Sequence, residues 1–153
     1  MDIGIDAKTR KQVAAKLEHV LAETYVLYGK THGYHWNVEG PRFLTLHTLF
    51  ETQYNELWTS LDLIAERIRA LGHYAPYGEA ITKRSTIKAD SGALDEDAML
   101  GALAAGNEAV VKAARACLLT AEEAGDQATA DLMTQRVAIG EKAAWMLRAH
   151  LPK

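Results

Sequence analysis

The chain has 153 residues, of which 48% are hydrophobic and 24% charged, and a formal net charge of −3. These values are typical of one soluble globular domain, 1–153, and give no general attraction to nucleic acid. No apolar run approaches the ~20 residues that a transmembrane helix needs, and the first residues, MDIGIDAKTRK, do not resemble a signal peptide. The single cysteine, Cys117, excludes an intrachain disulfide framework and favours a reducing cytoplasm. It lies in an apolar run and is expected in the core.

Long stretches rich in Ala, Leu, Glu, Lys and Arg predict an all-α fold. The first helix is expected from about Asp6 to Tyr34. The second is expected from about Pro41 to Leu71, with Gly72 stopping it. The linker from His73 to Leu94 is long for a bundle and is expected to hold a short helix around Gly78 to Arg84.

Two more helices are expected after this linker. Asp95 is placed to cap a third helix that ends near Gly125, and Asp126 to cap a fourth that runs to about Ala149. Four long helices with one long central connection predict an antiparallel four-helix bundle, with the short extra helix between its second and third helices. A single long crossover is the ferritin-like arrangement.

The second predicted helix carries two stripes at ~100° per residue. The first is apolar and is expected to face the core: Leu46, Phe50, Leu57, Leu61, Ile64 and Ile68. The second lies roughly 100° away and mixes apolar side chains with a histidine and carboxylates: Leu44, His47, Glu51, Trp58, Asp62 and Glu66. Such a mixture predicts a second buried surface, which a monomeric bundle does not need.

Within this second stripe, His47 and Glu51 form one i, i+4 pair, and Asp62 and Glu66 form another. Glu51 and Asp62 are separated by about 16 Å of helix, too far for one ion to bridge within a chain. An antiparallel two-fold axis through the helix midpoint would bring the two pairs of different copies together, creating two identical sites. His35, twelve residues before His47, is expected to fold over the same site.

Histidine nitrogen with several carboxylate oxygens suits iron or manganese better than structural zinc. No histidine follows a glutamate by three positions, so an intrachain di-iron centre of the ferritin type is disfavoured. The alternative is a solvated helix face, on which such i, i+4 pairs are frequent.

The run HWNVEGPRFLTLHTLFE, followed by LDLIAERIRALG, resembles the signature of the Dps family, mini-ferritins named for DNA protection in starved cells. The later segment AGDQATADLMTQRVAIGEKAAWML is similar to the family's final helix. This resemblance, which covers nearly the whole chain, implies a dodecameric shell in the bacterial cytoplasm. The shell would oxidise Fe(II) at sites between subunits, preferentially with hydrogen peroxide, and store the ferric mineral.

Carried over by the resemblance, the metal ligands are His35, His47, Asp62 and Glu66. Glu51 stands where the family usually has aspartate, and we expect it to support the weaker of two iron positions. Zinc or manganese are possible substitutes for iron.

Trp36 adjoins the first ligand. The resemblance implies a role as electron donor, whereas packing at a helix end is the alternative. His32 is expected to be a partly exposed polar residue.

DNA binding is expected to be weak or absent, because Lys8, Arg10, Lys11 and Lys16 are the only basic cluster near the start. There are two competing interpretations. One is a nucleoid-compacting protein with a secondary metal site, and the other is a structural oligomer with a degenerate site.

Overall fold

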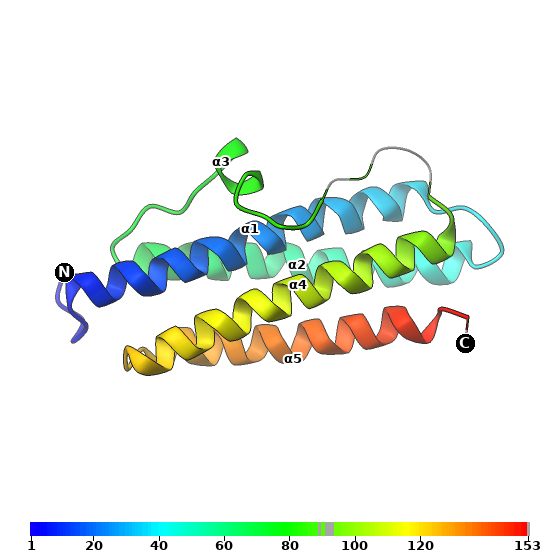
Figure 1. Cartoon of the computed structure of the whole chain (residues 1–153). Helices are drawn as coiled ribbons and strands as arrows, with labels where there is room; N and C mark the ends of the chain where they lie inside the picture. The colour runs from blue at the N-terminus through cyan, green and yellow to red at the C-terminus, as the bar shows by residue number, and fades with distance from the viewer. Residues whose placement is uncertain (89, 91–93, 153) are drawn as a thin grey trace.

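The computed structural model describes residues 1–88, 90 and 94–152. Its helices are α1 (Ala7–Asn37), α2 (Phe43–Ala70), α3 (Glu79–Thr82), α4 (Glu96–Glu123) and α5 (Gln127–Ala149). The four long helices lie side by side, and α3 sits outside them on the connection between α2 and α4 (Figure 1). The predicted all-α, ferritin-like bundle with one short extra helix is therefore confirmed.

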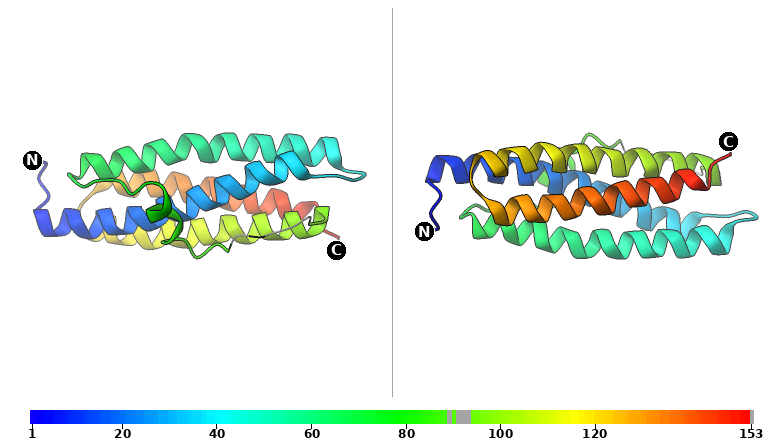
Figure 2. Two further views of the ribbon diagram at one scale, coloured as in Figure 1. Left: turned by 90° about the horizontal axis from the view of Figure 1, so that it is seen from above. Right: turned by 90° about the horizontal axis from the view of Figure 1, so that it is seen from below.

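The connection after α2 runs back along the bundle before α4 begins (Figures 1 and 2). Because of this crossover, α2 and α4 point in the same direction. Helices α1 and α2 are antiparallel neighbours joined by a short turn, and α4 and α5 form a second pair of the same kind. The two short turns thus make two helical hairpins, and the crossover places them against each other.

Helix α1 is longer than the sequence predicted, because it continues beyond Tyr34 to Asn37. The N–H of Val38 donates to the carbonyl oxygen of Tyr34 at 2.9 Å, which extends the helical hydrogen bonds over one further turn. His35 and Trp36 consequently lie on the last turn of α1 and not after its end.

Two other boundaries also differ from the prediction. Helix α2 begins at Phe43, two residues after Pro41, and α3 is shorter than the expected helix around Gly78 to Arg84. The predicted stop at Gly72 is confirmed, since this residue has a φ of +89°, which favours glycine. Residues 89 and 91–93 of the predicted linker lie outside the described residues.

Both predicted caps are confirmed. Asp95 accepts a hydrogen bond from the N–H of Ala98 at 2.8 Å, and Asp126 accepts one from the N–H of Thr129 at 3.0 Å. These carboxylates satisfy N–H groups that have no partner within their own helices. Asp126 is also paired with Arg67 of α2 at 2.7 Å, which ties the start of α5 to the end of α2.

The predicted core stripe of α2 is buried at all six positions: Leu46, Phe50, Leu57, Leu61, Ile64 and Ile68. Each of these side chains packs in one of two apolar clusters between the helices. Cys117 is buried as expected, and this burial raises the pKa of its thiol to about 12, so it stays protonated and acts as a small apolar side chain.

Candidate metal site

The last turn of α1 and the second turn of α2 bring His35 and His47 together. Their rings stack, with centroids 3.8 Å apart and planes inclined by 19°. Nδ1 of His35 lies 2.9 Å from the carbonyl oxygen of His47, and Nδ1 of His47 lies 2.8 Å from the carbonyl oxygen of His35. The two residues thus hold each other through a reciprocal pair of hydrogen bonds.

This reciprocity determines which ring nitrogen is free to bind a metal. A carbonyl oxygen can only accept, so the Nδ1 atom of each imidazole must carry the hydrogen. In the neutral rings, Nε2 of His35 and Nε2 of His47 then keep their lone pairs. Metal-binding histidines commonly donate their other N–H to a backbone carbonyl in this way, which fixes tautomer and ring orientation.

Two aromatic side chains restrain the histidine pair further. Phe43 stacks on His47 with ring centroids 5.1 Å apart, and Tyr54 meets His35 edge-on at 5.1 Å. Trp36, next to His35 on the last turn of α1, is 66% exposed. Its ring lies 4.3 Å from that of His32, measured between centroids, so both the electron-donor role and the packing role stay predictions.

Arg42 anchors the turn between the two histidines to the other helical hairpin. Its backbone N–H and its Nε donate to the two carboxylate oxygens of Glu96 at 2.9 and 2.8 Å. Its Nη1 also donates to the carbonyl oxygen of His150 at 2.9 Å. The start of α2, and with it His47, is therefore held at a defined position against α4 and the end of α5.

The three predicted carboxylate ligands lie on the exposed face of α2. Glu51 is one turn beyond His47, whereas Asp62 and Glu66 lie near the other end of the helix. Within the described residues, no three His, Cys, Asp or Glu side chains of one chain gather closely enough to hold a metal ion. The structure therefore brings His35 and His47 together and leaves Asp62 and Glu66 apart from them.

The same face of α2 carries large apolar side chains in contact with solvent. Leu44 is 73% and Trp58 61% exposed. An exposed leucine and tryptophan among carboxylates on one helix face are typical of a surface that another chain covers.

The comparisons with known proteins agree over almost the whole chain. Residues 14–153 match the ferritin-like domain family. The chain is 38% identical to DNA protection during starvation protein 2 of Bacillus anthracis, over 92% of this chain and 97% of that protein. The crystal structure of a Dps protein from Vibrio cholerae O1 has a TM-score of 0.93 and 34% identity, covering 98% of this chain and 95% of that one. The chain belongs to the Dps family.

A Nostoc low temperature-induced protein of uncharacterized function is also similar to this Dps-family chain, with 36% identity over 99% of this chain and 86% of that protein. The Vibrio cholerae protein is described as a member of the ferritin-like diiron-carboxylate superfamily. Among the helices within the described ranges, none is both long and apolar enough to cross a membrane.

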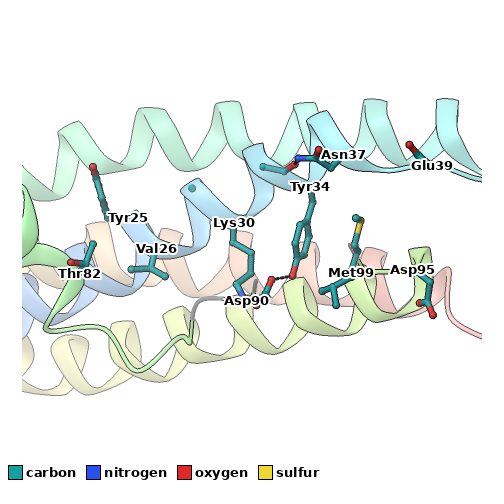
Figure 3. A pocket seen from close by; sticks show the side chains of 13 residues that line it. Tyr25, Val26, Lys30, Tyr34, Asn37, Glu39, Thr82, Asp90, Asp95 and Met99 are labelled. Carbon is teal, nitrogen blue, oxygen red and sulfur yellow. Dashed lines mark hydrogen bonds and ion pairs between the residues drawn. The ribbon is translucent and has the colours of Figure 1, made fainter. Parts of the chain in front are cut away.

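A groove on this Dps-family chain lies apart from the histidine pair. It has a volume of ≈ 820 Å³ and lies between α1 and the crossover (Figure 3). Lys30 and Tyr34 of α1 both donate to Asp90 of the crossover there. The described lining of this groove includes none of the predicted site residues. The candidate metal site is thus a half-buried pair of nitrogen donors that lies outside this groove.

Sequence reasoning missed the aromatic side chains that surround His32. The expectation of a partly exposed polar residue was correct for its burial, but Tyr28 and Tyr54 also contact its ring. The signal available in the sequence was the spacing of Tyr28, His32 and Trp36 at intervals of four, which puts the three rings on one face of α1.

Proposed function

We propose that this Dps-family protein is a mini-ferritin that oxidises Fe(II) and stores the ferric product inside a hollow dodecamer in the cytoplasm. The observation that carries the proposal is the reciprocal pair of hydrogen bonds between His35 and His47, which leaves the Nε2 lone pair of each ring free to bind a metal. Iron is the substrate in this proposal. Imidazole nitrogen with carboxylate oxygen suits Fe(II), and manganese or zinc are possible substitutes.

Each site is shared between two chains related by a two-fold axis. His35 and His47 come from one subunit, and Asp62 and Glu66 come from the other, while Glu51 supports the weaker of two iron positions. The exposed Leu44 and Trp58 support this arrangement, because a covering subunit would remove both from water. A two-fold interface brings the same contacts twice, so each dimer would contain two sites.

Hydrogen peroxide is the proposed oxidant. Two Fe(II) ions give two electrons to one peroxide molecule, which takes up two protons and leaves as two molecules of water. Because both electrons are transferred at one site, no hydroxyl radical is released, and DNA near the shell is protected. Two iron positions in one site are therefore part of the protective function.

A nucleoid-compacting protein is the second candidate. The observation that favours it is the exposure of Lys8, Lys11 and Lys16 at the start of α1. A dodecamer would present twelve copies of this cluster, and multivalency strengthens weak contacts. We place it second because Arg10, the fourth basic residue, donates within its own chain to the carbonyl oxygen of Leu71 at 3.2 Å.

Subunit mixing tests whether the site is shared. His47→Ala and Asp62→Ala proteins are expected to be inactive in peroxide-driven Fe(II) oxidation when each is assembled alone. After the two are mixed, dissociated and reassembled, a mixed dimer has one site with both defects and one intact site. About a quarter of all sites should then regain the parent rate if pairing is random.

The double variant, His47→Ala with Asp62→Ala on one chain, is the control, because mixing it with either single variant cannot rebuild a complete site. Recovery in the first mixture alone supports the shared site. No recovery in any mixture, although assembly is normal, would exclude it. Undiminished activity of the single variants would exclude these residues as ligands.

A further inference from the structure

The exposed face of α2 that carries Leu44 and Trp58 also carries a positive charge. At ~100° per residue, Arg69 falls between these two residues on the helical wheel, and all three side chains are exposed. Within the described part of the chain, no carboxylate pairs with the guanidinium of Arg69. The face that a second subunit is proposed to cover therefore ends in a positive charge that its own chain does not neutralise.

The segment that follows α2 holds the guanidinium of Arg69 in place. Its Nη1 donates to the carbonyl oxygen of His73 at 2.8 Å. Its Cζ lies 4.3 Å from the centroid of the Tyr74 ring, a distance at which the face of an aromatic ring attracts a cation. Tyr74 itself is 85% exposed. Arg69 and Tyr74 form a preorganised pair at the surface, which we call the Arg69–Tyr74 stack.

The end of a helix gives one reason for an arginine at this position. A positive charge in the last turn complements the helix dipole, and Arg69 lies in the last turn of α2. The dipole does not account for the exposed Tyr74 ring beside the guanidinium. Tyrosine and arginine are enriched in protein interfaces, where they contribute much of the binding energy. The Arg69–Tyr74 stack is therefore typical of a surface that another chain covers.

The bounds of α2 indicate which part of a second copy the stack meets. The proposed two-fold axis pairs Phe43 with Ala70, which are the first and last residues of α2. The turn before α2 in one copy thus lies beside the connection after α2 in the other. The same axis pairs Arg69 with Leu44, so the apolar stem of the arginine can cover the exposed leucine.

The turn before α2 supplies an exposed carboxylate, Glu39. This turn and the connection after α2 lie at opposite ends of the bundle (Figure 1). Glu39 and Arg69 of one chain are therefore separated by the length of α2, about 40 Å, and cannot pair with each other. The two-fold axis brings Glu39 of one copy to the end of the dimer where Arg69 of the other copy lies. The opposite charges of the two residues make these surfaces complementary.

We propose that the Arg69–Tyr74 stack of one subunit binds Glu39 of the other and closes the outer end of each shared site. This proposal rests on the proposed function, because it uses the same two-fold axis. The turn with Glu39 joins the helix ends that carry His35 and His47, whereas Arg69 lies one turn beyond the carboxylates on α2. The contact would thus hold the two halves of a site together. Arg69 and Glu39 are positioning residues in this arrangement and not metal ligands.

Charge reversal in separate subunits tests this contact. Arg69→Glu and Glu39→Arg each give a homodimer with two like-charged contacts. Each variant alone should dissociate at a protein concentration at least about tenfold above that of the parent. In a mixed dimer, the new carboxylate of one variant meets the new guanidinium of the other, and the two unchanged residues meet at the opposite end. Both contacts are then attractive, and no contact within a single chain could be restored in this way.

Native mass spectrometry of the two variants, co-expressed and with distinct mass tags, gives the fraction of mixed dimers. Co-expression makes the result independent of how much of either variant is recovered alone. Random pairing gives about half mixed dimers, whereas we expect a large majority, with a smaller excess at high salt. Arg69→Gln and Glu39→Gln are the matched controls, since they remove the charges without reversing them, and they should pair close to randomly.

Anaerobic Fe(II) titration of the same samples reports on the site. Each charge-reversed variant should bind less Fe(II) than the parent, and the mixed dimer should recover the parent stoichiometry. Random pairing of the charge-reversed variants, or normal assembly of each alone, would overturn the contact. Selective pairing with unchanged Fe(II) binding would overturn its role at the site. Pairing needs no iron, so a protein that pairs selectively and oxidises no Fe(II) would refute only the ferroxidase function.

Discussion

Glu23 and Thr86 are joined by two hydrogen bonds to one carboxylate oxygen: Oε1 of Glu23 accepts from the Thr86 N–H at 2.9 Å and from its hydroxyl at 2.6 Å. The other oxygen accepts from the Ser85 hydroxyl at 2.5 Å and from the N–H of Ile87 at 3.3 Å. Glu23 is almost fully buried on α1, and these three partners belong to the crossover. One carboxylate therefore fixes the long connection of the bundle to its first helix.

Glu23→Gln should lower the free energy of unfolding by about 1–3 kcal/mol, because the amide group would direct two hydrogens at groups that are themselves donors. The matched control is Glu18→Gln, which removes only the more exposed ion pair with Arg84 and should cost less than about 1 kcal/mol. Denaturant unfolding followed by circular dichroism, at one fixed protein concentration, measures both. If the two substitutions lowered the free energy of unfolding equally, Glu23 would not be the main residue that attaches the crossover to α1.

The pH dependence of stability provides a separate check on Glu23. Burial acts to raise its pKa, but hydrogen bonds from Ser85 and Thr86 outweigh burial and hold the pKa below its usual 4.5. The unfolded chain therefore binds the proton first as pH falls, and the folded state loses stability. This contribution should be complete above about pH 4.5 and disappear as pH falls through the lowered pKa. The difference in the free energy of unfolding between the parent and Glu23→Gln should therefore shrink as the pH is lowered. A difference that stays constant would contradict this role of Glu23.

His35→Ala and His47→Ala should each reduce peroxide-driven Fe(II) oxidation to the background rate, because each removes one nitrogen donor and the ring stacked on the other. Since the two residues act as a unit, the double variant should be no slower than either single variant. Absorbance of the ferric product measures the rates, and His73→Ala is the control at a histidine away from the pair. If the loss of rate in the double variant were instead the product of the losses in the two single variants, the two histidines would not act as a unit.

Glu51→Ala should lower the number of Fe(II) ions bound per site, with a smaller effect on the tighter position. Glu51→Asp keeps the carboxylate on a side chain shorter by one methylene and should restore most of the lost binding. Anaerobic Fe(II) titration gives the stoichiometry, and stopped-flow absorbance gives the oxidation rate. If Glu51→Ala changed neither quantity, Glu51 would have no part in the site.

Leu44→Glu should prevent or weaken assembly, because it places an unpaired charge on the face of α2 that a second copy is expected to cover. A buried charge without a partner costs several kcal/mol, roughly 3–5. Thr45→Glu, one position along and about 100° around the helix, is the control and should assemble normally. Native mass spectrometry reports the subunit number. Normal assembly of both variants would place the interface on another face.

DNA binding by the assembled protein should be weak and sensitive to salt. In a gel-shift assay, any retardation at about 50 mM salt should be lost at about 200 mM, since contacts of exposed lysines with phosphates depend on counterion release. Replacing Lys8, Lys11 and Lys16 by alanine should remove the remaining low-salt binding. Tight binding that persists at the higher salt concentration would favour the nucleoid-compacting function.

Local patterns determined the helices and much of the core. The Asp95 and Asp126 caps, the stop at Gly72 and the buried stripe of α2 followed from the sequence, because each depends on residues within a few turns of one another. Helical periodicity also identified the exposed stripe with Leu44 and Trp58. Periodicity also grouped His47, Glu51, Asp62 and Glu66, whereas the resemblance to the Dps family added Trp36 and supported His35 as a ligand. The roles of all these residues stay predictions.

Tertiary structure decided how side chains from different helices meet. The sequence did not reveal that His35 and His47 exchange Nδ1 hydrogen bonds, because this depends on the added turn of α1 and on the close approach of two helix ends. Nor did it reveal that Glu23 is buried beneath Thr86, 63 residues away. Periodicity indicates which face of a helix a residue occupies. It does not indicate which residue of another helix or of the crossover that face contacts. Only the folded bundle brings such residues within hydrogen-bonding distance.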